Sequence, residues 1–313
     1  MGRFREWDST LPHTFNLLDW MLSLNRYDAI WGHYLNPAGF AAAFFGKQNG
    51  IPSIVSIRGN DLDREMFPPG DFARLEWTLR NAGVVSSVTL ALAAKAQAVS
   101  GRTDIVLLHN VVDCAVFRLL DEDSSDLRKS LGIREEDAVL GFSGELREKK
   151  GLQPLLTALR HVQANRPACL LIIGDVRPSE MPRLLLEDRI IITGQLAGPA
   201  EVNRHLQLCD IYLQPSLWDG MPNALLEAMA AERGCIVSDA GGMPEMLTSG
   251  VEGVVLPRWQ LHRLGEAILE WLDSDLATRA RICKAARQRM IGSFHTDGEG
   301  KALQRLLERI SSS

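Results

Sequence analysis

Residues 211–230, with the sequence IYLQPSLWDGMPNALLEAMA, combine a strand pattern, a loop and the beginning of a helix. Ile211–Gln214 is a short, mostly apolar run of the length typical of buried strands. Pro222 suits the first helical turn, because its fixed φ is already helical and its missing N–H would be unpaired there. A strand that leads through a loop into a helix is the repeating unit of α/β domains.

Similar runs alternate with helical patterns along nearly the whole chain. The predicted strands are Asp28–Gly32, Pro52–Ile57, Gly83–Ser87, Asp104–Leu108, Ala138–Phe142, Cys169–Ile173, Ile190–Thr193, Ile211–Gln214, Cys235–Ser238 and Gly253–Leu256. Continuous apolar runs of this kind are typical of strands buried on both faces of a parallel sheet. We therefore predict an α/β fold with two doubly wound Rossmann-like domains.

The domain boundaries follow from the stretch 110–137, which lacks strand character and carries an acidic run. We predict a first domain at residues 1–115, with a helix around Phe15–Leu24, and a linker with a short helix at 116–137. The second domain is expected at 138–290. A C-terminal helix at 291–313 is expected to pack back toward the first domain. The last predicted helices are Gly265–Asp273, Leu276–Met290 and Gly300–Ile310.

Composition excludes several classes of protein. The 313 residues include 34 Lys plus Arg and 39 Asp plus Glu, a net charge of 34 − 39 = −5, which argues against nucleic-acid binding. The five cysteines are scattered, so neither a disulfide framework nor a zinc site is indicated. No apolar run approaches the length of a membrane span, and the N-terminus lacks a signal pattern. We expect a cytoplasmic protein.

Two carboxylates in the segment 211–230 are candidate ligand-binding groups. Asp219 lies in the predicted loop and Glu227 on the second turn of the predicted helix. A carboxylate accepts hydrogen bonds from sugar hydroxyls, so the two could hold two rings of one ligand. The free N–H groups of Asn223, Ala224 and Leu225 would form an anion site at the helix N-terminus. The alternative, equally weighted, is that Asp219 caps the helix and Glu227 is a solvated helix former.

A second candidate segment, Gly141–Leu152, follows the first strand of the second domain. The carboxyl ends of strands are where open α/β sheets bind ligands. Arg147 could bind a diphosphate through its two-pronged guanidinium, and Lys150 through its point charge. The alternative is a charged surface turn, which Glu145 and Glu148 favour.

Five motifs then occur in a fixed order: Gly144…Arg147…Lys150-Gly151, Ile172-Ile173-Gly174, Thr193-Gly194, Pro215-Ser216…Glu227-Ala228-Met229-Ala230 and Gly241-Gly242…Pro244-Glu245. Together they resemble the retaining family 4 glycosyltransferases of the GT-B architecture. Upstream, Ile51-Pro52…Arg58-Gly59-Asn60-Asp61 and His109-Asn110-Val111-Val112-Asp113…Phe117 extend the resemblance, which covers the chain from about Tyr27 onward.

The resemblance implies an enzyme that moves a hexose from a nucleotide-diphosphate sugar to a glycan, a lipid-linked sugar or a small molecule, with retention of configuration. It implies no cofactor and no metal. The implied catalytic residues are Arg147, Lys150, Asp219 and Glu227. The implied donor-binding residues are Gly144, Gly194, Gln195, Asn223, Ala224, Leu225 and Glu227.

The acceptor is expected to bind mainly to the first domain, at His33, Arg58, Asn60 and Asp61. For His33, a structural, hydrogen-bonded histidine is the alternative. A lipid-linked acceptor would bring the enzyme to the cytosolic face of a membrane, as a peripheral contact.

The sequence departs from the family pattern at four places. Asp219 stands where the family usually has Glu, Glu145 where many members have Arg, and Arg58 where many have His. The first domain is expected to be truncated, without its opening strands and Gly-rich loop. Two alternatives therefore stay open: an inactive donor-domain remnant that acts as a binding protein, and a half-enzyme whose missing strands come from a partner chain.

Overall fold

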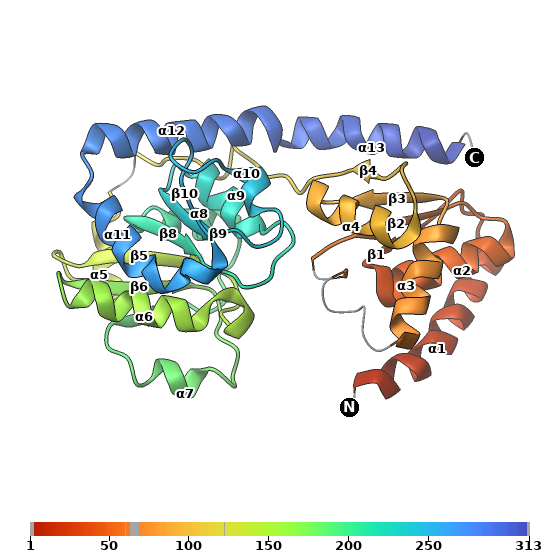
Figure 1. Cartoon of the computed structure of the whole chain (residues 1–313), viewed down its shortest axis with the longest axis horizontal. Coiled ribbons are helices and arrows are strands. Elements are labelled where there is room, and N and C mark those ends of the chain that lie inside the picture. Colours follow the sequence, from red (N-terminus) through yellow and green to blue (C-terminus); the bar gives the residue numbers. More distant parts are fainter. Residues whose placement is uncertain (1–2, 60, 63–68, 122, 312–313) are drawn as a thin grey trace. The chain divides into compact units, whose positions relative to one another are not determined.

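The computed structural model of the chain describes residues 3–59, 61–62, 69–121 and 123–311. These residues form two compact units. The first contains the described residues up to His109 together with those from Glu299 onward, and the second is Asn110–Gly298. Each unit is built on a parallel sheet with helices around it (Figure 1), so the predicted α/β class is confirmed.

The first unit has a four-stranded sheet in the order β1-β2-β3-β4, with all neighbours parallel. Every residue of the second strand is buried, as expected for a central strand covered on both faces. The elements are β1 (Ile30–His33), β2 (Ser53–Ile57), β3 (Val84–Ser87), β4 (Val106–Leu107), α1 (Arg3–Leu24), η1 (Leu35–Gly39), α2 (Phe40–Asn49), α3 (Pro69–Asn81) and α4 (Leu90–Ser100).

The last helix, α13 (Thr296–Ser311), supplies part of the core of the first unit. Its residues Leu306 and Ile310 pack with Ile54, Val84 and Leu108 of the sheet. Figure 1 shows this helix, in dark blue, beside the strands of the first unit. One face of the sheet is therefore covered by a helix from the opposite end of the chain.

The second unit has a six-stranded parallel sheet in the order β10-β9-β8-β5-β6-β7. The strand order reverses between β5 (Ala138–Ser143) and β8 (Ile211–Gln214), which makes this pair the topological switch point. The other strands are β6 (Ala168–Ile173), β7 (Ile190–Ile192), β9 (Cys235–Ser238) and β10 (Val254–Leu256).

Helices α6 (Leu152–Gln163) and α11 (Leu264–Asp273) pack against each other over one face of this sheet. Leu152, Leu155 and Leu159 recur at helical spacing along α6, so one apolar stripe is buried. Helix α9 (Asn223–Ala230) packs against α12 (Leu276–Ser293). The remaining helices are α5 (Ser125–Ser130), η2 (Glu148–Lys150), α7 (Met181–Leu184), α8 (Pro199–Leu206), α10 (Met243–Met246) and η3 (Arg258–Arg263).

All ten predicted strands are present, and their ends differ from the predicted ends by a residue or two. The largest difference is at the first helix, which begins at Arg3 rather than near Phe15 and contains Pro12. Within the described residues, no helix is both long enough and apolar enough to cross a membrane.

Candidate functional site

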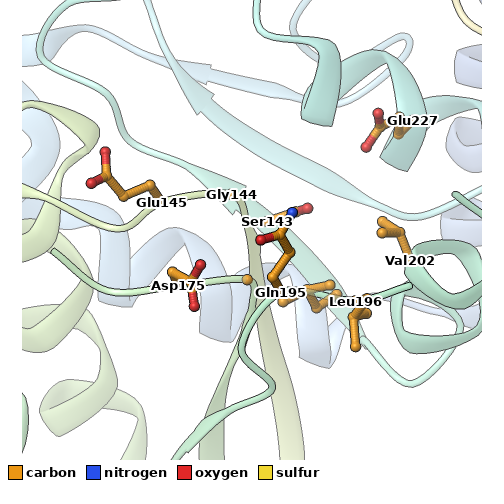
Figure 2. A pocket seen from close by; sticks show the side chains of 10 residues that line it. Ser143, Gly144, Glu145, Asp175, Gln195, Leu196, Val202 and Glu227 are labelled. Atoms are coloured by element: carbon orange, nitrogen blue, oxygen red, sulfur yellow. The ribbon is translucent and has the colours of Figure 1, made fainter. Parts of the chain in front are cut away.

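A pocket of about 410 Å³ lies at the carboxyl end of the second unit's sheet, beside the switch point. Ligands of open α/β sheets bind at such places. Figure 2 shows side chains entering it from several loops and from helices α8 and α9. The lining residues are Ser143, Gly144, Glu145, Ile173, Gly174, Asp175, Gln195, Leu196, Val202 and Glu227.

The floor of this pocket depends on a close approach of two loops. Gly144 follows β5 with φ 111°, and its N–H donates to the carbonyl of Ile173 at 2.9 Å. Gly174 follows β6 with φ 131°, and a Cβ there would lie 2.7 Å from the Gly144 carbonyl oxygen. Only glycine fits this approach, so the two glycines keep the pocket floor as bare backbone.

Glu227 is a partly buried acidic group of the pocket whose carboxylate has no hydrogen-bond partner among the described residues. It lies on the second turn of α9 and is partly buried, and burial raises the pKa of its carboxyl group. Among the described residues, nothing donates a hydrogen bond to this carboxylate. A partly dehydrated acceptor without a donor is expected to bind the hydroxyls of a ligand. The structure thus does not place Glu227 on a solvated helix face.

At the N-terminus of α9, three backbone N–H groups were expected to be free, and the structure differs at one of them. The N–H groups of Asn223 and Ala224 find no acceptor among the described residues. The N–H of Leu225, however, donates to the carbonyl of Pro222 at 3.1 Å. Two free amides, rather than the three expected, are therefore available at this helix end.

Lys150 and Asp219 form an ion pair, although they are 69 positions apart in the sequence. The Nζ of Lys150 donates to Oδ2 of Asp219 at 2.5 Å, and only 20% and 13% of the two side chains are exposed. The N–H of Gly220 donates to the other carboxylate oxygen at 3.0 Å. Helix α9 begins after Pro222 without a side-chain cap, so Asp219 does not cap it.

The loop that carries Asp219 is held by neighbouring backbone. The N–H of Leu217 donates to the carbonyl of Lys149 at 2.9 Å, which brings the loop to the turn containing Lys150. Gly241, with φ 57°, packs so tightly that a Cβ would lie 1.9 Å from the Asp219 carbonyl oxygen. The Lys150–Asp219 pair is thus fixed from both of its loops.

Arg147 lies at the rim of the same region. Its guanidinium is 3.4 Å from the carboxylate of Glu145, which Arg177 also binds through two hydrogen bonds. The bond from Arg177 lowers the pKa of the Glu145 carboxyl, so Glu145 stays ionised and balances part of the positive charge. The Nε of Arg147 is buried without a partner among the described residues.

Sequence reasoning missed three polar side chains on the switch-point strand and its loop: Tyr212, Gln214 and Ser216. They alternate along the chain, and each is at most 1% exposed. The tyrosine hydroxyl donates to Oε1 of Gln214 at 2.6 Å, and Nε2 of Gln214 donates to Oγ of Ser216 at 2.9 Å. The serine hydroxyl donates to Oδ2 of Asp219 at 3.2 Å. A polar residue at every second position of a buried strand is the sequence signal that could have found them.

The acceptor-side candidates lie in the first unit, and their surroundings differ. His33 ends β1 and is exposed, and partial burial together with the Arg58 charge lowers the pKa of its imidazole. Asp61 is 2% exposed and accepts from the backbone N–H groups of Leu35 and Arg58 at 3.2 and 2.9 Å. Asp61 therefore holds two loops together. Asn60 lies outside the described residues.

A further residue at this edge of the first unit is Tyr34. Its φ of 69° and ψ of 149° are rare for a residue with a side chain, and its side chain is 52% exposed. Hydrogen bonds fix the backbone on both sides: its N–H donates to Ser56 and its carbonyl accepts from Gly39, each at 2.9 Å. Such an outlier, fixed by its surroundings, is typical of a functional position.

Metal ligation has no candidate set in the described part of the chain. No three His, Cys, Asp or Glu side chains there lie close enough to share one ion. Groups in this region that can bind an anionic ligand include the guanidinium of Arg147, the ammonium of Lys150 and the two amides of α9.

Comparison with known families identifies both parts of the chain. Residues 123–289 match the family described as glycosyl transferases group 1. Residues 2–110 match the glycosyl transferase 4-like domain. The first match alone covers more than half of the chain.

Individual relatives are distant but cover most of the chain. A putative teichuronic acid biosynthesis glycosyltransferase of Bacillus subtilis is 24% identical over 91% of this chain and 72% of its own length. A GDP-mannose-dependent phosphatidylinositol monomannoside mannosyltransferase of Corynebacterium glutamicum is 26% identical over 95% and 80%. The structure of Anabaena HepE with UDP and glucose has a TM-score of 0.79 at 20% identity, and covers 98% of this chain and 81% of that one. This likeness confirms the predicted GT-B architecture.

Proposed function

Because the chain belongs to the group 1 glycosyl transferases, we propose that its second unit binds a nucleotide-diphosphate sugar and that the enzyme transfers the hexose with retention of configuration. The observation that carries this proposal is Glu227, a partly buried carboxylate without a protein donor in the switch-point pocket. A ribose supplies the adjacent hydroxyl pair that such an acceptor binds.

The charge distribution supports one orientation of the donor. Three carboxylates line the pocket, from Glu145, Asp175 and Glu227, so it disfavours a phosphate and suits a nucleoside. The diphosphate would instead lie toward Arg147, Lys150 and the N-terminus of α9. Positive charge and free amides together make an anion site there.

Charge stabilisation is the catalytic step that these residues can supply. Negative charge grows on the diphosphate oxygen as the bond to the sugar breaks. Arg147, Lys150 and the amides of Asn223 and Ala224 would stabilise that charge from fixed positions, as preorganised groups do. We propose that the reaction needs neither a metal nor a cofactor, and that the acceptor attacks from the face the diphosphate leaves.

The relatives suggest which classes of donor and acceptor this enzyme uses. One curated relative is named as GDP-mannose-dependent, and a structural neighbour was solved with UDP and glucose. We therefore propose a UDP- or GDP-linked hexose as the donor. His33 and Arg58 are proposed to contact the acceptor, which would be a glycan, a lipid-linked sugar or a small molecule.

The test is a thermal-unfolding panel with UDP, GDP, ADP and their hexose conjugates, with and without EDTA. A ligand at about 100 times its dissociation constant adds about 2.7 kcal/mol of stability. We expect one nucleotide to stabilise the protein regardless of EDTA, and Glu227→Ala to abolish the effect. A cooperative transition that no nucleotide shifts would refute donor binding. NMR of the product's anomeric proton tests retention once the donor is known.

A further inference from the structure

The three polar side chains on the switch-point strand and its loop are costly for the fold. Tyr212 and Gln214 lie on a central strand whose residues are all buried, and Ser216 is a buried residue of the loop after it; these three residues are hereafter the polar row. Residues 211 and 213 of the same strand are apolar and pack into the core cluster on the opposite face. Buried polar groups cost free energy unless all are hydrogen-bonded, and apolar residues of similar shape would serve the core as well.

The direction of each hydrogen bond in the polar row is fixed by chemistry. The amide oxygen of Gln214 can only accept, so the hydroxyl of Tyr212 donates to it. The amide nitrogen of Gln214 can only donate, so Ser216 accepts from it. The hydrogen of Ser216 is then available for Asp219, to whose Oδ2 it is directed. The row thus ends as a donor to the carboxylate that also binds Lys150.

At the other end of the polar row, Tyr212 pairs with Gly141 of β5, the strand that leads to the pocket. Strand β5 ends at Ser143, which lines the pocket beside Gly144. Burial raises the pKa of Tyr212 well above its ordinary value, so its hydroxyl keeps its proton. A continuous series of hydrogen bonds therefore joins the buried Tyr212 to the Lys150–Asp219 pair.

We propose that Tyr212, Gln214 and Ser216 are positioning residues that orient Asp219 and, through it, hold Lys150 in place for the chemical step. This inference rests on the proposed function of the pocket as a donor site. With Ser216 and Lys150 on Oδ2 and Gly220 on Oδ1, the carboxylate is held by three donors. Because none of the three residues lines the pocket, loss of the row should slow bond cleavage without weakening donor binding.

The experiment measures hydrolysis by the 313-residue protein: water takes the hexose in place of the acceptor, and UDP is released from UDP-glucose or GDP from GDP-mannose. Ser216→Ala and Tyr212→Phe interrupt the polar row at two places, so one informative variant remains if the other fails to fold. Ser53→Ala, a buried serine of the first unit, is the matched control. Both polar-row variants remove or weaken a hydrogen bond to the charged Asp219 carboxylate. We therefore expect their kcat to fall about tenfold or more, with KM changed less than twofold.

A double-mutant cycle shows whether the effect passes through Asp219. In an Asp219→Asn background, Ser216→Ala should cause little further loss, because its partner has already changed. Additive losses would overturn the proposal, as would a rise in KM at constant kcat or a Ser216→Ala variant that behaves like Ser53→Ala.

The same samples separate this inference from the proposed function. If neither UDP nor GDP stabilises the wild type, donor binding fails and the inference fails with it. If a nucleotide stabilises the wild type and the polar-row variants cleave donor normally, only the inference is refuted. Binding without any cleavage by the wild type would also overturn it, because no chemical step would depend on the row.

Discussion

Replacing Glu227 by glutamine is expected to change two properties in opposite directions: it should stabilise the ligand-free protein and weaken nucleotide binding. The carboxylate is partly buried without a donor, and burial raises its folded-state pKa above the ordinary value of 4.5. A carboxyl whose pKa is raised by folding contributes stability at low pH, and that stability is lost as the pH rises through the folded pKa. At pH 7 the ionised group therefore destabilises the fold, and glutamine removes that cost.

The expected loss of binding follows from the hydrogen bonds that the carboxylate would make. A hydrogen bond to a charged group contributes about 1.5–3 kcal/mol, which corresponds to about 10- to 100-fold in dissociation constant. At a nucleotide concentration about 100 times the wild-type dissociation constant, the wild type gains about 2.7 kcal/mol. The variant would gain about 1.4 kcal/mol after a tenfold loss and about 0.4 kcal/mol after a hundredfold loss.

The assay is thermal unfolding with and without UDP or GDP, at several pH values from 7 down to 4.5. Glu270→Gln, an exposed glutamate on α11, is the matched control and should change neither quantity. The stability advantage of Glu227→Gln should shrink as the pH falls. The reasoning is refuted if the variant is less stable than the wild type at pH 7, or if it binds nucleotide with unchanged affinity.

Three other changes test separate parts of the structure. Lys150→Ala should lower the rate of donor cleavage about 10²–10³-fold, because it removes a fixed charge-stabilising group, whereas Lys150→Arg keeps the charge and should lose less of the rate. The rate of product release measures both variants, and an unchanged rate in Lys150→Ala contradicts the role assigned to Lys150. Gly241→Ala should destabilise the second unit by about 1–3 kcal/mol and weaken donor binding, because the new Cβ would collide with the Asp219 backbone. Calorimetry measures the change in stability, and an unchanged melting temperature would mean that the loop moves freely. Tyr34→Gly should stabilise the first unit by about 1 kcal/mol, because glycine adopts the positive φ without strain, whereas Tyr34→Ala should not stabilise it. Equal melting temperatures of the glycine and alanine variants would show that the backbone at position 34 is unstrained.

The features that the sequence predicted well are those encoded locally. The apolar runs 169–173 and 235–238 read as buried strands because neighbouring residues carry the whole signal. The start of α9 after Pro222 was predictable for the same reason. The first helix was predicted too short: it was expected around Phe15–Leu24, whereas α1 begins at Arg3 and continues through Pro12.

The features that could not be predicted depend on residues far apart in the chain. The pairing of Lys150 with Asp219 requires two loops from different strands to meet, and no local pattern encodes that meeting. Asp61 has the composition of a binding group, yet packing buries it and two backbone donors use it. The Leu225 amide was expected to be free, but the first turn of its own helix engages it. In each case the three-dimensional neighbours, rather than the residue type, decide the role.

The position of α13 has a consequence for the order of folding during synthesis. Domains made by the ribosome commonly fold from the N-terminus onward. Here Leu306 and Ile310 complete a core whose other members include Ile54 and Val84, so strands made early must wait for a helix made much later. The second unit, which is contiguous, can close before most of α13 is made. The nascent first sheet therefore keeps an apolar face uncovered until α13 is made, and during that interval it is most exposed to chaperones and to misassociation.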